Sequence, residues 1–284
     1  MMQLSPELLA WVGHARVVEE DVGLAATRRI AAMLDLDPGS FRLGDALPAH
    51  WFSMFFAETA RQSDIGPDGH PKPGVTLPPI PLPRRMGAGR RVTLHGPIRV
   101  GEMLSRTTEV AAITPKQART GFITVLTMRN TIRRGDEILA VDEFDAVYRE
   151  AVKPGEKSAV NAAVPAPANP DWAVQKHLSE TLVFRYSAIT WNAHRIHYDA
   201  DYARCAEGYP ATVQNGGLTM QLLLDALVAH VPDTLKSFSA RLTRPISVGE
   251  TVRFAGHAPA AGRATAWVQN SEGAVCAQVE AVFG

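Results

Sequence analysis

The chain has 284 residues, of which 46% are apolar and 20% charged, a composition typical of a globular protein with one large domain or two of ordinary size. Basic and acidic side chains balance at 29 each, so there is no net positive field to hold nucleic acid. The start lacks a secretory signal pattern, and no apolar run reaches the roughly 20 residues that span a bilayer, so we expect a soluble, cytoplasmic protein. Cys205 and Cys276 suit a reducing compartment and leave one disulfide possible.

The first part of the chain reads as helices, an aromatic core segment and a long loop. Ser5 can cap a short helix, and residues Val22 to Leu36 carry apolar side chains at helical spacing. The aromatic run WFSMFFA at 51–57 predicts buried core. Residues 66–83, GPDGHPKPGVTLPPIPLP, hold too many prolines and glycines for regular structure. We expect a long ordered loop there, and such loops in compact domains are usually functional or mobile.

A β-rich pattern begins near Arg90. β-Branched residues and a period of two predict strands at 110–114, 122–132 and 138–148, with a hairpin turn at Arg134 to Asp136. Residues 151–170 are rich in proline and alanine and predict a linker. Beyond it, the patterns predict a strand at Leu182 to Tyr186, a buried helix at Leu218 to Val228, and strands at 251–256, 264–269 and 275–283.

A six-residue motif occurs twice in the chain. Pro97 to Glu102 reads PIRVGE, and Pro245 to Glu250 reads PISVGE. A common turn used twice would explain the motif, but not its place before two similar sets of predicted strands. We therefore predict an α+β protein that contains two copies of a helix-on-antiparallel-sheet unit, at residues 1–150 and 171–284.

Titratable groups concentrate in one short segment of the second unit. His194, Arg195, His197 and Asp199 lie within six residues, in WNAHRIHYD. His197 can give and take protons near neutral pH, whereas Asn192 offers hydrogen bonds without proton transfer. The first unit has no equivalent of His197 in its helical region, so we expect one active site per chain. The alternative is that these histidines have a structural role.

A glycine pair stands at the start of the predicted buried helix. Gly216 and Gly217 precede Leu218, and the N–H groups at a helix N-terminus are unpaired and carry partial positive charge. They can stabilise an oxyanion, although glycine before a helix is common. With a proton-transferring histidine, they suit chemistry at the α and β carbons of a thioester or ketone.

Other kinds of site are less well supported. A zinc site built on His194 and His197 lacks a third ligand nearby in the sequence, so we predict no metal. Arg84 and Arg85 are either surface charges or contacts for a phosphate. The chain has neither a GxGxxG motif after a strand nor a P-loop, which argues against a nucleotide-binding enzyme.

The residues around the cluster resemble a known family. Phe184 to Asp199, which contains SAITWNAHRIHYD, is followed by Tyr209-Pro210 and by NGGL at 215–218, and is similar to the MaoC-like hot-dog hydratases and dehydratases. The branch that it resembles most contains mesaconyl-CoA/itaconyl-CoA hydratases and the type 2 3-hydroxyacyl-thioester dehydratases. The loop GPDGHPKPGVTLPPIPLPRRMGAG and HGPIRVGE fit the same branch. The resemblance implies a double hot-dog fold, with an N-terminal hot-dog at 1–150 that lacks the catalytic motif and a C-terminal MaoC-like hot-dog at 171–284 that holds the active site.

The resemblance also implies roles for the clustered residues. The family motif is Asp, any residue, Asn-Pro, any residue, His. His197 stands at its histidine and Asn192 at its aspartate, with His194 and Arg195 in place of Asn-Pro. Asn192 is therefore expected to orient water, because an amide cannot deprotonate it. The proton work falls on His197, and Asp199 or His194 is a candidate to share it.

Further substrate contacts are implied at the helix start and by arginines. Gly216 takes the place of the glycine that binds the thioester carbonyl, and Asn215 stands where the family usually has histidine. Asn215 and Gly217 are expected beside the substrate. A distal carboxylate or a CoA phosphate is expected to pair with Arg195, Arg84 or Arg85.

The implied activity is that of a hydro-lyase. It adds water reversibly across the α,β double bond of a short branched or dicarboxylic enoyl-CoA, of the mesaconyl-C4-CoA or itaconyl-CoA type, and uses no cofactor apart from the CoA of the substrate. The alternatives are a hot-dog acyl-CoA thioesterase, a non-catalytic acyl-thioester binder, and a 3-hydroxyacyl-thioester dehydratase of fatty acid metabolism. Exposed strand edges and the family habit of pairing hot-dogs suggest a homodimer.

Overall fold

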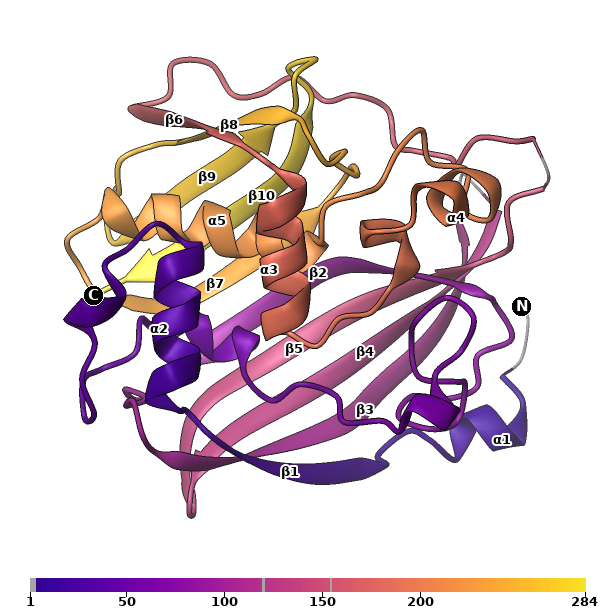
Figure 1. Cartoon of the computed structure of the whole chain (residues 1–284), viewed down its shortest axis with the longest axis horizontal. Helices are drawn as coiled ribbons and strands as arrows, with labels where there is room; N and C mark the ends of the chain where they lie inside the picture. Colours follow the sequence, from indigo (N-terminus) through magenta and orange to yellow (C-terminus); the bar gives the residue numbers. More distant parts are fainter. Residues whose placement is uncertain (1–3, 119–120, 154) are drawn as a thin grey trace.

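The structure is a computed structural model that describes residues 4–118, 121–153 and 155–284. Within these residues, antiparallel strands form one ten-stranded sheet in the order β1-β3-β4-β5-β2-β7-β10-β9-β8-β6 (Figure 1). The strands are β1 Ala15–Asp21, β2 Arg84–Leu94, β3 Met103–Ala118, β4 Gly121–Arg134, β5 Glu137–Arg149, β6 Trp172–His177, β7 Leu235–Leu242, β8 Thr251–Gly256, β9 Arg263–Gln269 and β10 Val275–Phe283.

The sheet consists of two halves with the same topology. Counted from either edge inward, each half places its strands in the chain order first, third, fourth, fifth, second. The halves join where β2 pairs with β7, with Gly89 opposite Arg241 and Thr93 opposite Ser237. This arrangement confirms the predicted α+β fold with two copies of one unit. The domain boundaries at 150 and 171 stay a prediction.

The repeated motif forms the same turn in both halves. Gly101 and Gly249 have φ angles of +95° and +91°, a left-handed conformation that favours glycine. The Glu102 carboxylate accepts a hydrogen bond from the Arg99 N–H at 2.9 Å, and that of Glu250 accepts one from the Ser247 N–H at 2.8 Å. The motif thus closes each turn with its own glutamate before β3 and β8 begin.

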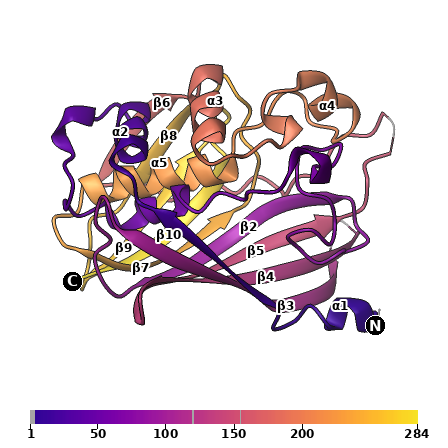
Figure 2. The same cartoon turned by 60° about the horizontal axis from the view of Figure 1, so that its bottom comes forward.

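Helices α2 Leu24–Met33, α3 Glu180–Ile189, α4 Ala200–Cys205 and α5 Gly216–Ala229 lie over one face of the sheet, and α1 Pro6–Leu9 lies beside β3 at its edge (Figure 2). The 3₁₀ turns are Pro38–Ser40, Ala49–Met54, Gln62–Asp64 and Arg195–His197. The α5 helix is buried along most of its length, because its sequence is apolar nearly all round. The predicted aromatic core segment is confirmed: Trp51 and Phe52 are buried in the same core as α5.

One predicted element is wrong. Residues Leu182 to Tyr186 form part of helix α3 and not a strand. The Ser179 hydroxyl caps the helix by accepting a hydrogen bond from the Leu182 N–H at 3.2 Å. A strand would have buried Phe184 together with Leu182 and Tyr186, but Phe184 is 70% exposed. The strand of this region is β6, which precedes the helix.

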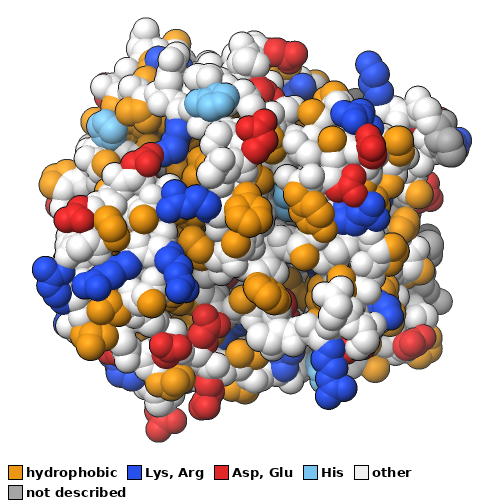
Figure 3. All heavy atoms as spheres, in the orientation of Figure 1, with side chains coloured by type: hydrophobic (Ala, Val, Ile, Leu, Met, Phe, Trp, Pro, Cys, Tyr) orange, Lys and Arg blue, Asp and Glu red, His pale blue; other side chains and the backbone are white. Residues whose placement is uncertain are grey.

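Several other expectations are confirmed. Residues 66–83 form an irregular loop, and strands β3, β4 and β5 contain the three predicted in that region. Cys205 is exposed, Cys276 is buried, and both are free thiols in the structure, so the possible disulfide does not form between them. None of the helices in the described ranges is long and apolar enough to cross a membrane. Basic and acidic side chains are interspersed on the face shown in Figure 3.

Candidate active site

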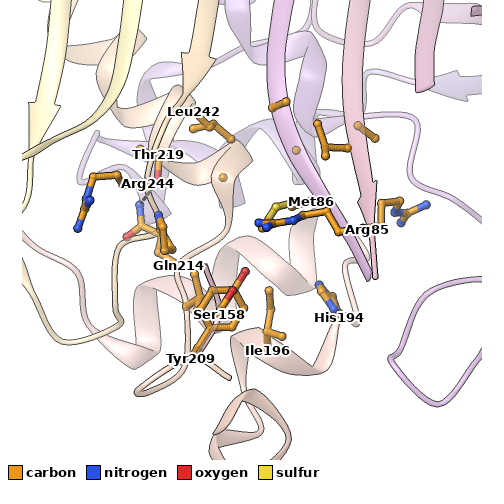
Figure 4. A pocket seen from close by; sticks show the side chains of 18 of the residues that line it. Arg85, Met86, Ser158, His194, Ile196, Tyr209, Gln214, Thr219, Leu242 and Arg244 are labelled. Carbon is orange, nitrogen blue, oxygen red and sulfur yellow. Dashed lines mark hydrogen bonds between the residues drawn. The ribbon is translucent and has the colours of Figure 1, made fainter. Parts of the chain in front are cut away.

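A cavity of about 510 Å³ lies where the two halves of the molecule meet. Its walls come from β2 and the long loop of the first half, and from the polar segment, the start of α5 and β7 of the second half (Figure 4). The lining residues with polar or charged side chains include His70, Arg85, His194, His197, Gln214, Thr219 and Arg244. The cavity therefore depends on both halves.

His197 is held as a neutral base. It lies in the 3₁₀ turn Arg195–His197, and its Nδ1 is 2.7 Å from the carbonyl oxygen of Val213. Because a carbonyl can only accept, Nδ1 must carry the proton, and Nε2 keeps its lone pair. Burial lowers the pKa of His197 to about 4. The ring is thus neutral at neutral pH and can accept a proton at Nε2.

His194 and His70 extend this site into a row of three imidazoles. The His194 ring lies 5.5 Å from that of His197 and 4.1 Å from that of His70, between ring centroids. Nδ1 of His70 bonds the Asp68 carboxylate at 2.9 Å. Burial is the main cause that lowers the pKa of His194, to about 2, and it also lowers the pKa of His70.

The loop that carries Asp68 and His70 docks on the backbone of the polar segment. The Arg195 N–H donates to the Asp68 carbonyl oxygen at 2.8 Å, and the Arg195 guanidinium donates to the Pro67 carbonyl oxygen at 3.0 Å. Gly69 has a φ of +91°, and a Cβ at this position would collide with the carbonyl group of Ala193. Glycine therefore permits an approach between the two segments that no other residue would allow.

Sequence reasoning missed Asp68 and His70. The only signal was the composition of their loop, which marked it as functional or mobile without selecting any side chain. Their position beside His194 depends on a contact between the two halves of the chain, which spacing along the sequence does not reveal.

The start of α5 also faces the cavity. Gly216 is a lining residue, and a Cβ there would collide with the Leu242 side chain. The N-cap residue Asn215 makes no side-chain capping hydrogen bond; its amide contacts the Ser187 hydroxyl at 3.2 Å instead. The first N–H groups of the helix are thus left without the cap that Asn215 could supply, as an oxyanion site requires. Gly217 packs against Tyr186 and not into the cavity.

Three residues of the polar segment lie outside the cavity lining, as far as the described residues show. The Asn192 carboxamide oxygen accepts a hydrogen bond from the His194 N–H at 3.1 Å, so it shapes the turn. The Asp199 carboxylate caps α4 at the Tyr202 N–H and pairs with Arg195, with Oδ2 at 2.6 Å from Nη2. The described contacts of all three are with the protein itself, and their expected contacts with water or substrate stay a prediction.

The two neighbouring arginines have different positions, because successive residues of a strand point to opposite faces. Arg84 is buried and pairs with Glu207 at 2.5 Å, and it also donates to the Ser158 hydroxyl at 2.8 Å. The structure therefore places Arg84 in an ion pair between the halves and not among the cavity-lining side chains. Arg85 lines the cavity, as Figure 4 shows.

A metal could in principle bind beside His194, because ligand atoms of Asp68, His70 and His194 all lie within 4.8 Å of one another. This group contains His194 but not His197, so it differs from the pair that the sequence offered. However, Asp68 and His70 already bond each other directly at 2.9 Å. We interpret the group as a hydrogen-bonded dyad beside a third ring.

Comparisons with known proteins match the part of the chain that contains the cavity-lining segments. A profile of the family described as hydroxyacyl-thioester dehydratase type 2 matches residues 49–248. A mesaconyl-C(4)-CoA hydratase from Chloroflexus aurantiacus is 37% identical over 248 residues, which cover 85% of this chain and 86% of the relative. Both matches span the long loop, the polar segment and the start of α5.

Solved structures share the fold. A MaoC-like dehydratase from Phytophthora capsici has a TM-score of 0.71 at 16% identity, with 98% of this chain and 97% of that chain covered. A Mycobacterium tuberculosis protein described as a double hotdog has a TM-score of 0.57 at 16% identity, with 95% and 96% covered. The chain therefore belongs to the hydroxyacyl-thioester dehydratase type 2 family and is a hydro-lyase with a double hot-dog fold.

Proposed function

We propose that this chain catalyses the reversible addition of water to the α,β double bond of a short dicarboxylic enoyl-CoA, of the mesaconyl-C4-CoA type. The observation that carries the proposal is the joint position of a neutral histidine, His197, and the start of helix α5 in one cavity. The identity to a mesaconyl-C(4)-CoA hydratase over most of the chain supports the choice of substrate. The proposed reaction needs no cofactor besides the CoA that the substrate carries.

The geometry suggests how the reaction proceeds. Nε2 of His197 takes a proton from water while the water oxygen bonds to the β-carbon. The π electrons move toward the α-carbon and the thioester oxygen, and N–H groups at the start of α5 stabilise the negative charge on that oxygen. Gly216 lines the cavity at this point, so the substrate carbonyl can reach the helix start from there. A proton delivered to the α-carbon completes the hydration.

Arg85 is the residue that we assign to the distal carboxylate. A guanidinium can hold a carboxylate by two parallel hydrogen bonds. Among the arginines that line the cavity, Arg149 and Arg244 donate to the main chain of Ala159 and Asn161. Arg85 instead extends from β2 into the cavity (Figure 4).

The thioesterase alternative has less support. It required a carboxylate to activate water at the carbonyl carbon, and Asp199 was the candidate. Asp199 is paired with Arg195 and caps α4, so its oxygens are engaged away from the cavity. A purely binding protein would not need an imidazole held neutral with a free Nε2 beside an uncapped helix start.

The test uses the purified chain with mesaconyl-C4-CoA, itaconyl-CoA and crotonyl-CoA. Loss of enoyl-thioester absorbance is followed beside an assay for free thiol. We expect loss of absorbance without thiol release, and a fall in kcat of about 10²-fold or more for His197→Gln, because general base catalysis contributes that much. Arg85→Met should raise KM for the dicarboxylic substrates by about tenfold, as one charge-assisted contact is worth, and leave crotonyl-CoA unaffected.

His177→Gln is the matched control, because His177 is exposed on β6. It should retain full activity. Release of thiol at the rate of absorbance loss would identify a thioesterase. Turnover that survives His197→Gln within a few fold on every substrate would disprove the site assignment.

A further inference from the structure

Two histidines of the cavity have ring protons held by different partners. Nδ1 of His197 faces the neutral carbonyl of Val213, whereas Nδ1 of His70 faces the carboxylate of Asp68. A carboxylate stabilises a protonated imidazole much more than a carbonyl does. The geometry thus favours His197 as the group that accepts a proton, and it makes His70 the ring that holds a second proton more readily than His197 does. Where the environment pushes the pKa values of two titratable groups apart, the difference indicates which group acts as the acid and which as the base.

The loop around His70 is built to fix this pair. The Gly66 N–H donates to the His70 carbonyl oxygen at 2.7 Å, and the His70 N–H donates to Oδ1 of Asp68 at 3.1 Å. Asp68 therefore contacts both the main chain and the ring of His70. With Gly69 docked on Ala193, these bonds define where the His70 ring enters the cavity.

We propose that His70, positioned by Asp68, is a second catalytic group, supplied by the first half of the chain, which delivers the proton to the α-carbon. The proposal rests on the hydratase function above and names the group that completes it. It also explains how the site works with Asn192, which cannot transfer protons and bonds the His194 main chain instead.

The complete step balances as follows. One O–H bond of water breaks as His197 takes the proton, and the water oxygen bonds to the β-carbon. The π pair of the C=C bond becomes the electron pair of the new C–H bond at the α-carbon, whose proton leaves Nε2 of His70. His197 then returns its proton to solvent and His70 takes one up, so both regain their starting states.

The groups that face His70 connect this step to the substrate. They are Asp68, the His194 ring at 4.1 Å and the positive charge of Arg85. Burial and Arg85 lower the pKa of His70, and Asp68 acts in the opposite direction. A substrate carboxylate bound to Arg85 would cancel the positive charge and favour the protonated ring. Binding of the correct substrate would thus favour protonation of His70.

The experiment measures kcat, KM and pH–rate profiles for hydration by the wild type, His70→Gln and Asp68→Asn. We expect kcat to fall by about 10²- to 10³-fold in His70→Gln with KM changed by less than about threefold. The wild-type rate should decline as pH rises through the pKa of His70, which burial lowers from its ordinary value. His70→Gln should lack that decline while keeping the low-pH limb due to His197. Asp68→Asn should move the high-pH decline to lower pH.

Lys72→Gln is the control, because the Lys72 side chain is exposed on the same loop and its ammonium donates to the Ser63 carbonyl oxygen. It should behave as the wild type. Asp68→Asn, which preserves size, provides the decisive profile if His70→Gln does not fold.

Three outcomes would overturn the proposal while leaving the hydratase function intact. They are His70→Gln activity within about threefold of wild type, a profile lowered uniformly with both limbs kept, and wild-type activity that chelator removes and zinc restores. The last would mean that the same side chains hold a cation. A wild type that hydrates none of the enoyl-CoA substrates would instead refute the proposed function itself.

Discussion

At the scale of single residues, the protonation state of each histidine in the site depends on how deeply its ring is buried. His194 is 5% exposed, and its pKa is lowered to about 2, first by burial and then by the neighbouring His70 and His197. His197 follows the same trend, with a pKa of about 4. Both rings are neutral in the folded chain at pH values where they would be protonated in the unfolded chain.

This difference predicts a loss of stability in mild acid. In the unfolded chain a histidine ring has a pKa of about 6.5, so below that pH the unfolded chain binds more protons than the folded chain. The folded chain is therefore most stable above that pH, and it loses stability as pH falls toward the pKa of the ring in the folded chain. Each buried histidine should reduce the free energy of unfolding by about 1.4 kcal/mol per pH unit over most of this range.

Urea unfolding at pH 7, 6 and 5 measures the slope. For His194→Gln, the free energy of unfolding should change with pH by about 1.4 kcal/mol per pH unit less than it does for the wild type. The control His177→Gln, at an exposed position, should show the same dependence on pH as the wild type. Equal slopes for wild type and His194→Gln would show that this ring is protonated in the folded chain.

At the scale of elements, the start of α5 is defined by what its two glycines touch. Gly216 faces the cavity, and Gly217 lies against the Tyr186 hydroxyl of helix α3. A Cβ at position 217 would collide with that hydroxyl oxygen, while the ring carbon behind it would be 3.3 Å away. The second glycine is therefore needed for the packing of α5 on α3.

Gly217→Ala should destabilise the protein by about 1–3 kcal/mol, the usual cost of overpacking a filled core. The same substitution made together with Tyr186→Phe should cost much less, because the second change removes the colliding oxygen. Thermal or urea unfolding of both single variants and the double variant gives the coupling. Additive effects would mean that the collision is relieved by movement of α5.

At the scale of the whole molecule, the two halves are joined by more than the β2–β7 pairing. Arg84 of the first half and Glu207 of the second are 6% and 9% exposed and pair at 2.5 Å. A buried pair contributes little net stability compared with apolar residues, but removal of one partner leaves an uncompensated charge. The pair therefore specifies how the halves meet around the cavity.

Arg84→Met should lower the free energy of unfolding by about 3–5 kcal/mol, and Arg84→Met with Glu207→Gln should lose less than the sum of the two single changes. The partly exposed pair Arg129–Glu143, with 43% and 30% exposure, is the control and should couple by less than about 1 kcal/mol. A double-mutant cycle by urea unfolding measures both. A large rise in KM for Arg84→Met without a change in stability would show that Arg84 contributes to substrate binding.

The sequence by itself determined the fold and the family, and it pointed to the segment that we propose to react. Periodicity and the repeated PxxVGE turns predicted two similar units, because apolar alternation and turn glycines are local properties. The pattern around His197 identified the family, and Gly216, the first residue of α5, indicated the proposed oxyanion site. The error at Leu182 to Tyr186 arose because a run of five residues, four of them apolar, is too short to separate a strand from a helix.

Only the tertiary structure decided which polar residues meet in the cavity. Asp68 and His70 join His194 from the other half, while Asn192 and Arg195 turn out to hold the backbone of the segment and the docked loop. The adjacent arginines Arg84 and Arg85 have opposite positions because a strand alternates its faces. Hydrogen bonds across distant segments and the burial of each group depend on packing, and no spacing along the chain encodes them.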